Sequence, residues 1–263
     1  MAKAKVAVLV YPGTNSEEET QRILRDVGID SELVHWSRAE TLARYDVYVL
    51  PGGFAYEDRI RAGAIAAHDR MTDAVIEGAQ KGRLVFGICN GAQILLEAGL
   101  VPGTGPVRRP TAAFTHNAPL GKFVCRRVHV KLTIEPRRCA ITASLEPDAL
   151  IPAWAAHGEG RLAASDEHLR EIEAGAHIAF VYAHADGAVD EAAIPNGSAL
   201  GAAALTNRAG NVLAIMPHPE RDAWTFNHPD STFGERSFGH QSKAMAPSGG
   251  SVLFESFAKA VRS

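Results

Sequence analysis

Short apolar runs alternate with amphipathic segments through the first hundred residues of the chain. The run Val6–Val10 is apolar at every position, which is typical of a strand buried on both faces of a parallel sheet. After a turn, Ser16 with Glu19 three residues later forms a capping-box pattern, and Gly28 ends the helical periodicity that follows. The chain is therefore expected to open with a strand followed by a helix.

The same alternation recurs along this half of the chain. It predicts a strand at 33–35, a short helix capped by Ser37 and Glu40, a strand at 46–50, a helix over 62–80, a strand at 84–86 and a helix over 92–100. Repeated strand–helix units feed a parallel sheet, because each crossover returns the chain to the edge where the previous strand began. We therefore expect an α/β fold.

The pattern changes after Phe114. Residues 123–130 alternate, and short strands without intervening helices indicate antiparallel additions to the sheet. A buried strand is predicted at 212–216, a long surface loop at 227–250, and a terminal helix that contains Leu253 and Phe257. Because no repeat or interdomain linker interrupts the chain, a single domain over residues 1–263 is expected.

Composition narrows the class of protein. With 46% hydrophobic and 22% charged residues among 263, the chain is expected to be soluble and globular. A net charge of −3 offers no global basic field for nucleic acid or an anionic membrane, so small ligands and protein partners are favoured. Three widely spaced cysteines form no disulfide framework, and the first apolar run is too short for a signal or a membrane span. We expect a cytoplasmic protein.

The sharpest chemical feature is Gly87-Ile88-Cys89-Asn90-Gly91, between an apolar strand and a helix. This is the nucleophile-elbow pattern with cysteine as the nucleophile. Small flanking residues allow the tight turn, and the helix amino terminus favours a thiolate. Cys125 and Cys139 lack such surroundings and are interpreted as buried structural residues that pack like small hydrophobic side chains.

A thiolate nucleophile needs a histidine as general base and acid, and the histidine needs a carboxylate to orient it. His218 follows a predicted strand, with Glu220 two residues later and Pro217 and Pro219 stiffening the backbone. The prolines favour an extended path, on which both side chains leave on the same side. A solvated surface turn is the alternative, and the presence of Cys89 favours the catalytic interpretation.

Attack on a carbonyl also requires donors for the oxyanion. The N–H of Asn90 in the elbow is one candidate, and the N–H of Gly53 in Pro51-Gly52-Gly53 is another. Such a glycine turn could also bind phosphate, but the chain has neither a P-loop nor a complete G-x-G-x-x-G motif. It also has no cluster of residues at zinc-ligand spacing, so no metal is expected.

Together these motifs resemble those of class I glutamine amidotransferases, whose Cys-His-Glu triad releases ammonia from glutamine. More specifically, the chain is similar to the glutaminase subunits of phosphoribosylformylglycinamidine synthase. Beyond the motifs above, the similarity is carried by Tyr11-Pro12-Gly13-Thr14-Asn15, residues 51–66, Ala156-His157-Gly158-Glu159-Gly160-Arg161, Pro195-Asn196-Gly197-Ser198, Gly210-Asn211-Val212-Leu213 and Met216-Pro217-His218-Pro219-Glu220-Arg221. These segments occur in the same order over nearly the whole chain.

The resemblance implies a flavodoxin-like α/β fold with a mixed, mainly parallel sheet, helices on both faces and a nucleophile elbow. It also implies a role for seven residues: Cys89 as nucleophile, His218 as general base and acid, Glu220 as orienting carboxylate, Gly53 and Asn90 as the oxyanion hole, and Gln93 and Phe54 as substrate-binding residues. The chain departs from the family pattern at Ala55, Glu57 and Ala92 and over 222–250. His157 and Glu159 either line the site or form a structural turn.

The same resemblance implies partners and cofactors. A large synthetase subunit, with a small bridging subunit as a further candidate, would use the ammonia in purine biosynthesis, and ATP and magnesium would bind that synthetase and not this chain. The free subunit is expected to be weakly active. Two alternatives remain open at this point: a cysteine hydrolase or peptidase of related fold, and a non-catalytic regulatory module.

Overall fold

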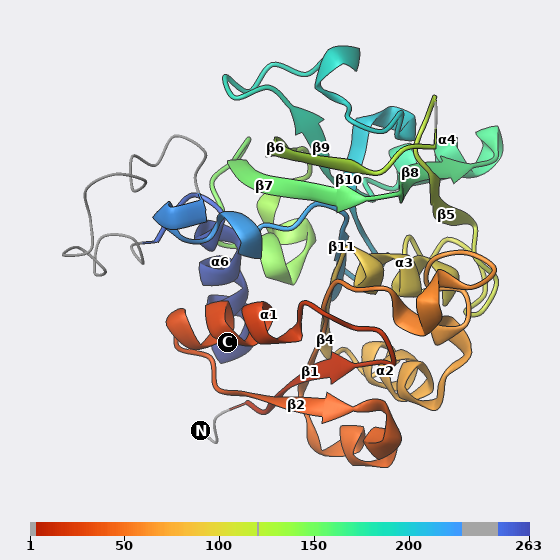
Figure 1. The fold of residues 1–263 in the computed structure, drawn as a ribbon, viewed down its shortest axis with the longest axis vertical. Coiled ribbons are helices and arrows are strands. Elements are labelled where there is room, and N and C mark those ends of the chain that lie inside the picture. Colours follow the sequence, from red (N-terminus) through yellow and green to blue (C-terminus); the bar gives the residue numbers. More distant parts are fainter. Residues whose placement is uncertain (1–3, 120, 228–246) are drawn as a thin grey trace.

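A nine-stranded sheet forms the centre of the protein, in the strand order β2-β1-β3-β4-β11-β10-β9-β6-β7 (Figure 1). The computed structural model describes residues 4–119, 121–227 and 247–263. The strands of this sheet are β1 (Val6–Val10), β2 (Ser31–His35), β3 (Val47–Leu50), β4 (Leu84–Ile88), β6 (Val124–Leu132), β7 (Leu150–His157), β9 (Ile178–Ala183), β10 (Ala202–Thr206) and β11 (Val212–Ile215). A separate two-stranded sheet pairs β5 (Ala112–His116) with β8 (Glu159–Ala164).

The large sheet is parallel in one half and antiparallel in the other. Strand β1 pairs in parallel with β2 and β3, and β4 pairs in parallel with β3 and β11. From β11 outward, the pairings through β10, β9, β6 and β7 are antiparallel. The order β2-β1-β3-β4 followed by β11 is the flavodoxin-type arrangement, so the expected mixed fold with antiparallel additions is confirmed.

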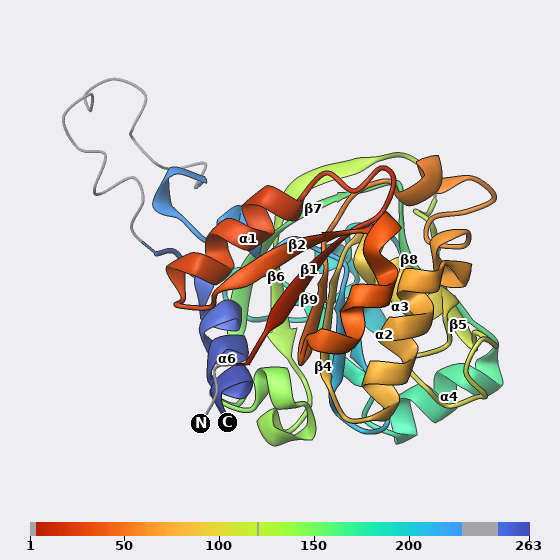
Figure 2. The same cartoon turned by 90° about the horizontal axis from the view of Figure 1, so that it is seen from below.

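Helices cover both faces of the sheet, as expected. Figure 2 shows α1 and α6 on one side and α2 and α3 on the other. The α-helices are α1 (Glu17–Asp26), α2 (Arg70–Gln80), α3 (Asn90–Glu97), α4 (Asp166–Ala174) and α6 (Ser251–Arg262). The 3-10 helices are η1 (Trp36–Arg44), η2 (Ala55–Asp58), η3 (Ala66–His68), η4 (Pro136–Arg138), η5 (Ala140–Thr142), η6 (Glu191–Ala193), η7 (Ala199–Gly201), η8 (Glu220–Asp222) and η9 (Thr225–Asn227). Within the described ranges, no helix has the length and apolar character needed to cross a membrane.

Both predicted capping boxes are wrong. Ser16 is the N-cap residue of α1, but its side chain caps no backbone N–H. Its Oγ instead accepts a hydrogen bond from Arg221, which also pairs with Glu19. At the second site Ser37 lies inside η1 and its Oγ bonds the ring of His35. Tertiary partners have therefore replaced the local capping interactions.

The helix predicted over 62–80 begins later than expected. Asp69 is extended and its carboxylate accepts a hydrogen bond from Met71 N–H at 2.7 Å, so α2 starts at Arg70. The preceding residues contain only the short helix η3. The predicted loop over 227–250 falls largely on residues 228–246, which lie outside the described residues, whereas the terminal helix is confirmed as α6.

Aromatic side chains hold the terminal helix α6 against the central strand β4. Phe254 and Phe257 of α6 pack against Phe86 of β4, with ring centroids 5.7 and 5.5 Å apart.

The parallel strands β1, β3, β4 and β11 all run in the same direction, so their carboxyl ends lie along one edge of the sheet. The loops that follow them therefore meet at that edge, which is where ligands bind in open α/β sheets.

Candidate active site

Cys89 occupies a strained turn between β4 and α3. Its backbone lies at φ 50° and ψ −106°, its N–H donates to the Ile215 carbonyl at 2.8 Å, and the residue is only 5% exposed. A Cβ atom on Gly91 would overlap the Leu50 carbonyl, and one on Gly87 would come within 2.5 Å of Leu95. Only glycine fits on either side, so the predicted elbow geometry is confirmed and its physical reason is close backbone packing.

His218 is held beside the edge of the sheet by β7. Its N–H donates to the Trp154 carbonyl at 2.8 Å, and its own carbonyl accepts from Trp154 N–H at 3.0 Å. The imidazole Nδ1 lies 2.5 Å from a carboxylate oxygen of Glu220, and both side chains are buried. The path is not extended as predicted, because Pro219 has φ −71° and ψ −27° and starts the helix η8. The two side chains nevertheless meet.

The surroundings of His218 favour its charged form. Burial alone would lower its pKa, but the Glu220 carboxylate and then Cys89, by charge and by hydrogen bonds, outweigh burial and raise the pKa of His218 to about 10. The imidazole is therefore protonated at neutral pH. A charged imidazolium beside Cys89 holds a proton ready for a leaving group.

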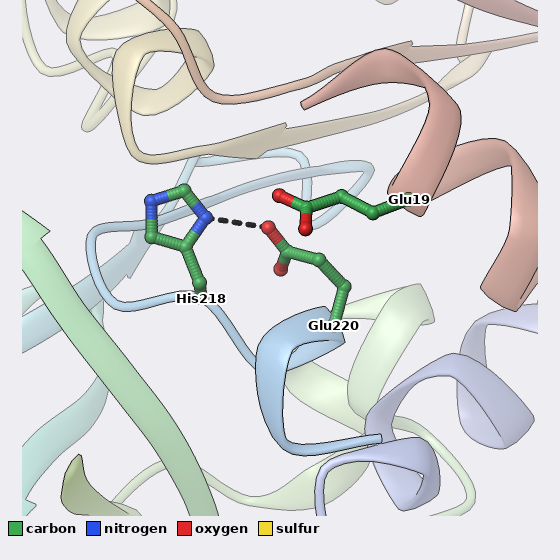
Figure 3. A group of neighbouring side chains, drawn as sticks. All are labelled: Glu19, His218 and Glu220. Atoms are coloured by element: carbon green, nitrogen blue, oxygen red, sulfur yellow. Dashed lines mark hydrogen bonds and ion pairs between the residues drawn. The ribbon is translucent and has the colours of Figure 1, made fainter. Parts of the chain in front are cut away.

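Glu19 from α1 approaches the same histidine and carboxylate, as Figure 3 shows. Ligand atoms of Glu19, His218 and Glu220 lie within 4.8 Å of one another, a spacing that could hold a metal ion. The guanidinium of Arg221 already lies 3.0 Å from Glu19, and although burial lowers the pKa of Arg221, the charge of Glu19 and then that of Glu220 raise it. A fixed cation at this place opposes the binding of another, so the cluster is better explained as charge compensation around the imidazole.

The glycine turn after β3 is fixed by the loop after β1. The Gly52 carbonyl accepts hydrogen bonds from the N–H groups of Asn15 and Ser16 at 3.3 and 3.2 Å, and Gly53 forms a bridge with Thr14. Because the peptide bond is planar and trans, the N–H of Gly53 points opposite to the Gly52 carbonyl. The turn is connected to the elbow, since Gly91 N–H donates to the Pro51 carbonyl at 3.1 Å.

Gly52 has no side chain, and the imidazole of His218 lies against the position that a Cβ atom would take. A Cβ atom there would lie 2.5 Å from Cε1 of His218 and 3.2 Å from the Ser16 hydroxyl. We expect Gly52→Ala to displace the imidazole and to lower catalytic turnover about 10- to 100-fold, because a small misplacement of a catalytic group is costly. Steady-state kinetic assays on the purified variant measure this effect.

Gly82→Ala is the control for that substitution. Nothing lies within 4 Å of a Cβ atom at Gly82, and its φ of +85° is the only obstacle. We expect it to lose roughly 1 kcal/mol of stability through backbone strain and no activity. Equal activity of the two variants would show that the imidazole does not depend on the space at Gly52.

A cavity of about 440 Å³ brings most of the predicted site residues together. Its walls include Gly53, Phe54, Cys89, Gln93 and His218. Asn90 and Glu220 lie directly behind this wall and are almost completely buried. A cavity of about 700 Å³ between α1 and α6 is larger, but neither Cys89 nor His218 lines it. The smaller cavity is therefore the candidate active site.

Both residues whose role was left open, His157 and Glu159, line this cavity. The same cavity includes Asp58 and Arg221, neither of which was singled out from the sequence. Both lie in segments that carried the family resemblance, which was the available signal. Cys139 is buried as predicted, whereas Cys125 is exposed and lines the cavity, so its interpretation as a buried structural residue is wrong.

Comparison with known proteins agrees with this geometry. The family model described as a CobB/CobQ-like glutamine amidotransferase domain matches residues 3–256. The glutaminase domain of Trypanosoma brucei CTPS shares the fold, with a TM-score of 0.56 at 12% identity over 98% of this chain and 94% of that one. The family match defines the chain as a glutamine amidotransferase.

Relatives define the family more narrowly. The chain is 41% identical to the phosphoribosylformylglycinamidine synthase subunit PurQ of Aquifex aeolicus, over 82% of this chain and 90% of that protein. It is 40% identical to PurQ of Bradyrhizobium diazoefficiens, over 88% and 91%. The structure of PurLQS from Thermotoga maritima matches with a TM-score of 0.74 at 28% identity, over 98% of this chain and 99% of that one. The chain belongs to the PurQ family of phosphoribosylformylglycinamidine synthase subunits.

Proposed function

We propose that this glutamine amidotransferase hydrolyses L-glutamine at Cys89 and delivers the ammonia to a synthetase that makes formylglycinamidine ribonucleotide. The observation that carries the proposal is the buried pair of His218 and Glu220, 2.5 Å apart, next to a cysteine in a strained elbow. A peptidase or a non-catalytic module is disfavoured by the family match and by this complete set of groups. The reaction belongs to purine biosynthesis.

The chemistry proceeds in two steps. The thiolate of Cys89 attacks the side-chain amide carbon of glutamine, and the carbon–nitrogen bond breaks as His218 donates its proton to the departing ammonia. Water then adds to the glutamyl thioester, His218 takes up a proton from it, and the carbon–sulfur bond breaks to release glutamate and restore the thiolate. Glu220 keeps the imidazole oriented and stabilises its charge throughout.

Backbone donors would stabilise the oxyanion of both steps. We assign this role to the N–H groups of Gly53 and Asn90, which belong to the two turns that meet at Cys89. Gln93 and Phe54 line the same cavity and are assigned to substrate binding. The side chain of Asn90 supports the arrangement, because its Oδ1 accepts from Ala55 N–H at 2.9 Å.

Ammonia release is useful only beside an enzyme that consumes it. One similar solved structure is that of PurLQS from Thermotoga maritima, so we propose a large synthetase subunit as the partner, with a small bridging subunit as a second one. ATP and magnesium are assigned to the synthetase, and this chain, as one domain over residues 1–263, is proposed to need no cofactor. Its three cysteines are free, which is consistent with a cytoplasmic location.

Reconstitution tests the proposed function. The chain and its synthetase subunit are purified from the same organism and combined, and glutamine-dependent formation of formylglycinamidine ribonucleotide is measured with ATP and magnesium. We expect product to form only when both proteins are present. Product formed from glutamine by the synthetase alone, or none formed by the complex, would contradict the proposal.

We further expect the partner to control reactivity at Cys89. A flip of the 52–53 peptide would turn the N–H of Gly53 away from the site, and one misplaced donor costs ~10²–10³ in rate. The Gly52 carbonyl is bonded to Asn15 and Ser16, so such a flip requires the loop after β1 to move as well. Labelling of Cys89 by a glutamine-like electrophile, measured with and without the synthetase and its substrates, should be faster in the complex. Equal labelling would mean that the site is already formed.

A further inference from the structure

Ser16 and Glu19 form a sequence pattern that the proposed chemistry does not use. In the structure both side chains meet the guanidinium of Arg221, whose Nε donates to Glu19 at 3.0 Å and whose Nη2 donates to the Ser16 hydroxyl at 3.0 Å. Arg221 comes directly after the triad carboxylate Glu220 and also lines the candidate active-site cavity. A two-pronged contact therefore joins the loop that carries the triad to the start of α1.

The short helix η8 is held by three consecutive side chains. Glu220 reaches the imidazole of His218, and Arg221 reaches α1. Asp222, which is completely buried, accepts two hydrogen bonds from Arg127 of β6 at 2.6 and 3.1 Å. Because η8 is also anchored to the sheet in this way, Arg221 extends from a fixed point. Its contact with α1 therefore holds the start of that helix in place relative to the triad.

Ser16 contacts the glycine turn after β3 through both its backbone and its side chain. Its N–H donates to the Gly52 carbonyl at 3.2 Å, beside the bond from Asn15 N–H at 3.3 Å. Its hydroxyl lies against the same residue, since a Cβ atom on Gly52 would come within 3.2 Å of it. Rotation of the 52–53 peptide would break both hydrogen bonds to the carbonyl. The orientation of this peptide therefore depends on where Ser16 is held.

The loop after β1 packs closely against the next residues of the glycine turn. Phe54 N–H donates to the Gly13 carbonyl at 2.9 Å, and Thr14 forms a bridge with Gly53. A Cβ atom on Gly53 would lie only 2.7 Å from the Cα atom of Thr14. Close-packed segments move together, because no space separates them. A displacement of the loop after β1 is therefore transmitted to the N–H of Gly53.

The charge of Arg221 balances that of Glu19. Figure 3 shows Glu19 reaching from α1 toward His218 and Glu220, and ligand atoms of these three residues lie within 4.8 Å of one another. Two carboxylates beside one imidazolium leave one negative charge without a partner. Burial lowers the pKa of Arg221, but the charge of Glu19 and then that of Glu220 raise it, so the guanidinium is charged. Its contact with α1 is therefore charge-assisted, which makes it stronger than a neutral hydrogen bond.

We propose that Arg221 is a positioning residue, which holds the start of α1 and thereby keeps the N–H of Gly53 directed at the oxyanion. The inference rests on the proposed function, since it takes Gly53 as an oxyanion donor. Arg221 acts through the loop after β1 and not by contact with glutamine. The contact requires a guanidinium, because the single ammonium group of lysine has no rigid fork that could reach both Ser16 and Glu19.

The test separates the oxyanion donor from the nucleophile, using the chain in complex with its synthetase. Hydrolysis of glutamine passes through an oxyanion, whereas iodoacetamide alkylates Cys89 by loss of iodide from a saturated carbon and forms none. Arg221→Lys keeps the charge and removes the fork. It should lower kcat for glutamine about 10- to 100-fold and change KM less than about threefold, because a donor is misplaced. The rate of Cys89 alkylation, measured by mass spectrometry of its peptide, should stay within about threefold.

Ser16→Ala removes the other end of the same hydrogen bond while its backbone N–H stays in place. We expect it to lower kcat by a factor similar to that of Arg221→Lys and to leave Cys89 alkylation unchanged. Because both substitutions break one contact, the double variant should be no slower than the slower single variant. Losses that multiply in the double variant would mean that the two residues act separately, and would overturn the inference.

Arg59→Lys is the matched control, since Arg59 also pairs with a glutamate, Glu57, but its side chain is 69% exposed. It should leave kcat, KM and alkylation unchanged. In Arg221→Lys, an unchanged kcat would overturn the inference. So would a loss confined to KM, which would mean direct binding of glutamine, or equal losses of turnover and alkylation, which would mean a general disturbance of the site. Failure of the unmodified complex to hydrolyse glutamine, with Cys89 still open to alkylation, would instead refute the proposed function and with it the basis of the inference.

Discussion

Cys89→Ala and Cys89→Ser are expected to abolish glutamine hydrolysis while the protein remains folded. The thiol forms the covalent bond in the proposed reaction, and no other group in the described part of the chain combines an elbow position with a charged histidine. Losing it should lower turnover by about 10⁴-fold or more, whereas the melting temperature should shift by only a few degrees. A glutaminase assay and a thermal unfolding curve on the same preparation provide both numbers.

The complex supplies an internal control for this prediction. With ammonium chloride in place of glutamine, synthesis should be unchanged in the Cys89 variants, because ammonia bypasses the glutaminase step. Cys125→Ser removes an exposed thiol from the same cavity and should keep glutamine hydrolysis within about threefold of the unmodified protein. Retained hydrolysis in either Cys89 variant would remove the basis of the assignment.

Glu220→Gln is expected to have the second largest effect. The substitution keeps the shape of the side chain but removes the charge that lies 2.5 Å from the imidazole of His218. Turnover should fall by about 10³–10⁴-fold, as expected when the carboxylate of such a triad is neutralised. Binding of glutamine should change much less, because Glu220 lies behind the cavity wall.

The pH profile separates this role from a structural one. Because the pKa of His218 is raised to about 10, the imidazolium persists as the pH rises, and activity should decline only as the pH approaches that value. Without the Glu220 charge the pKa is lower, so the alkaline limb of kcat/KM should move to lower pH. Glu57→Gln is the control, since Glu57 is exposed, pairs with Arg59 and should leave the limb in place. An unchanged alkaline limb in Glu220→Gln would mean that Glu220 does not act on the imidazole, and the triad would reduce to the pair of Cys89 and His218.

The elbow and the meeting of His218 with Glu220 could be predicted because each involves a few neighbouring residues of the sequence. Glycines on both sides of Cys89 are required by the Leu50 backbone and the Leu95 side chain, so the requirement is visible as a sequence pattern. The two-residue spacing of His218 and Glu220 was enough to predict that their side chains meet, although the path between them is a helical turn and not an extended segment. Alternation of strand and helix patterns predicted the parallel half of the sheet for the same local reasons.

Long-range contacts account for the errors. Ser16 and Glu19 match a capping box, but Arg221, about two hundred residues away in the chain, takes both side chains. Asp58 was not predicted as a site residue. The three residues 56–58 all have positive φ values, but none of them is a glycine or asparagine that would indicate such a conformation. Cys125 lines the cavity only because β6 pairs with β7 and β9 at the antiparallel end of the sheet.

The most direct test of the account is to trap the covalent intermediate. The chain in complex with its synthetase is mixed with L-glutamine and quenched in acid within the turnover time, and the digested protein is examined by mass spectrometry. The account predicts one glutamyl group on the peptide that contains Cys89, and none in the Cys89→Ser complex. Rapid hydrolysis of glutamine with the glutamyl group on another residue, or with Cys89 unmodified throughout, would contradict it.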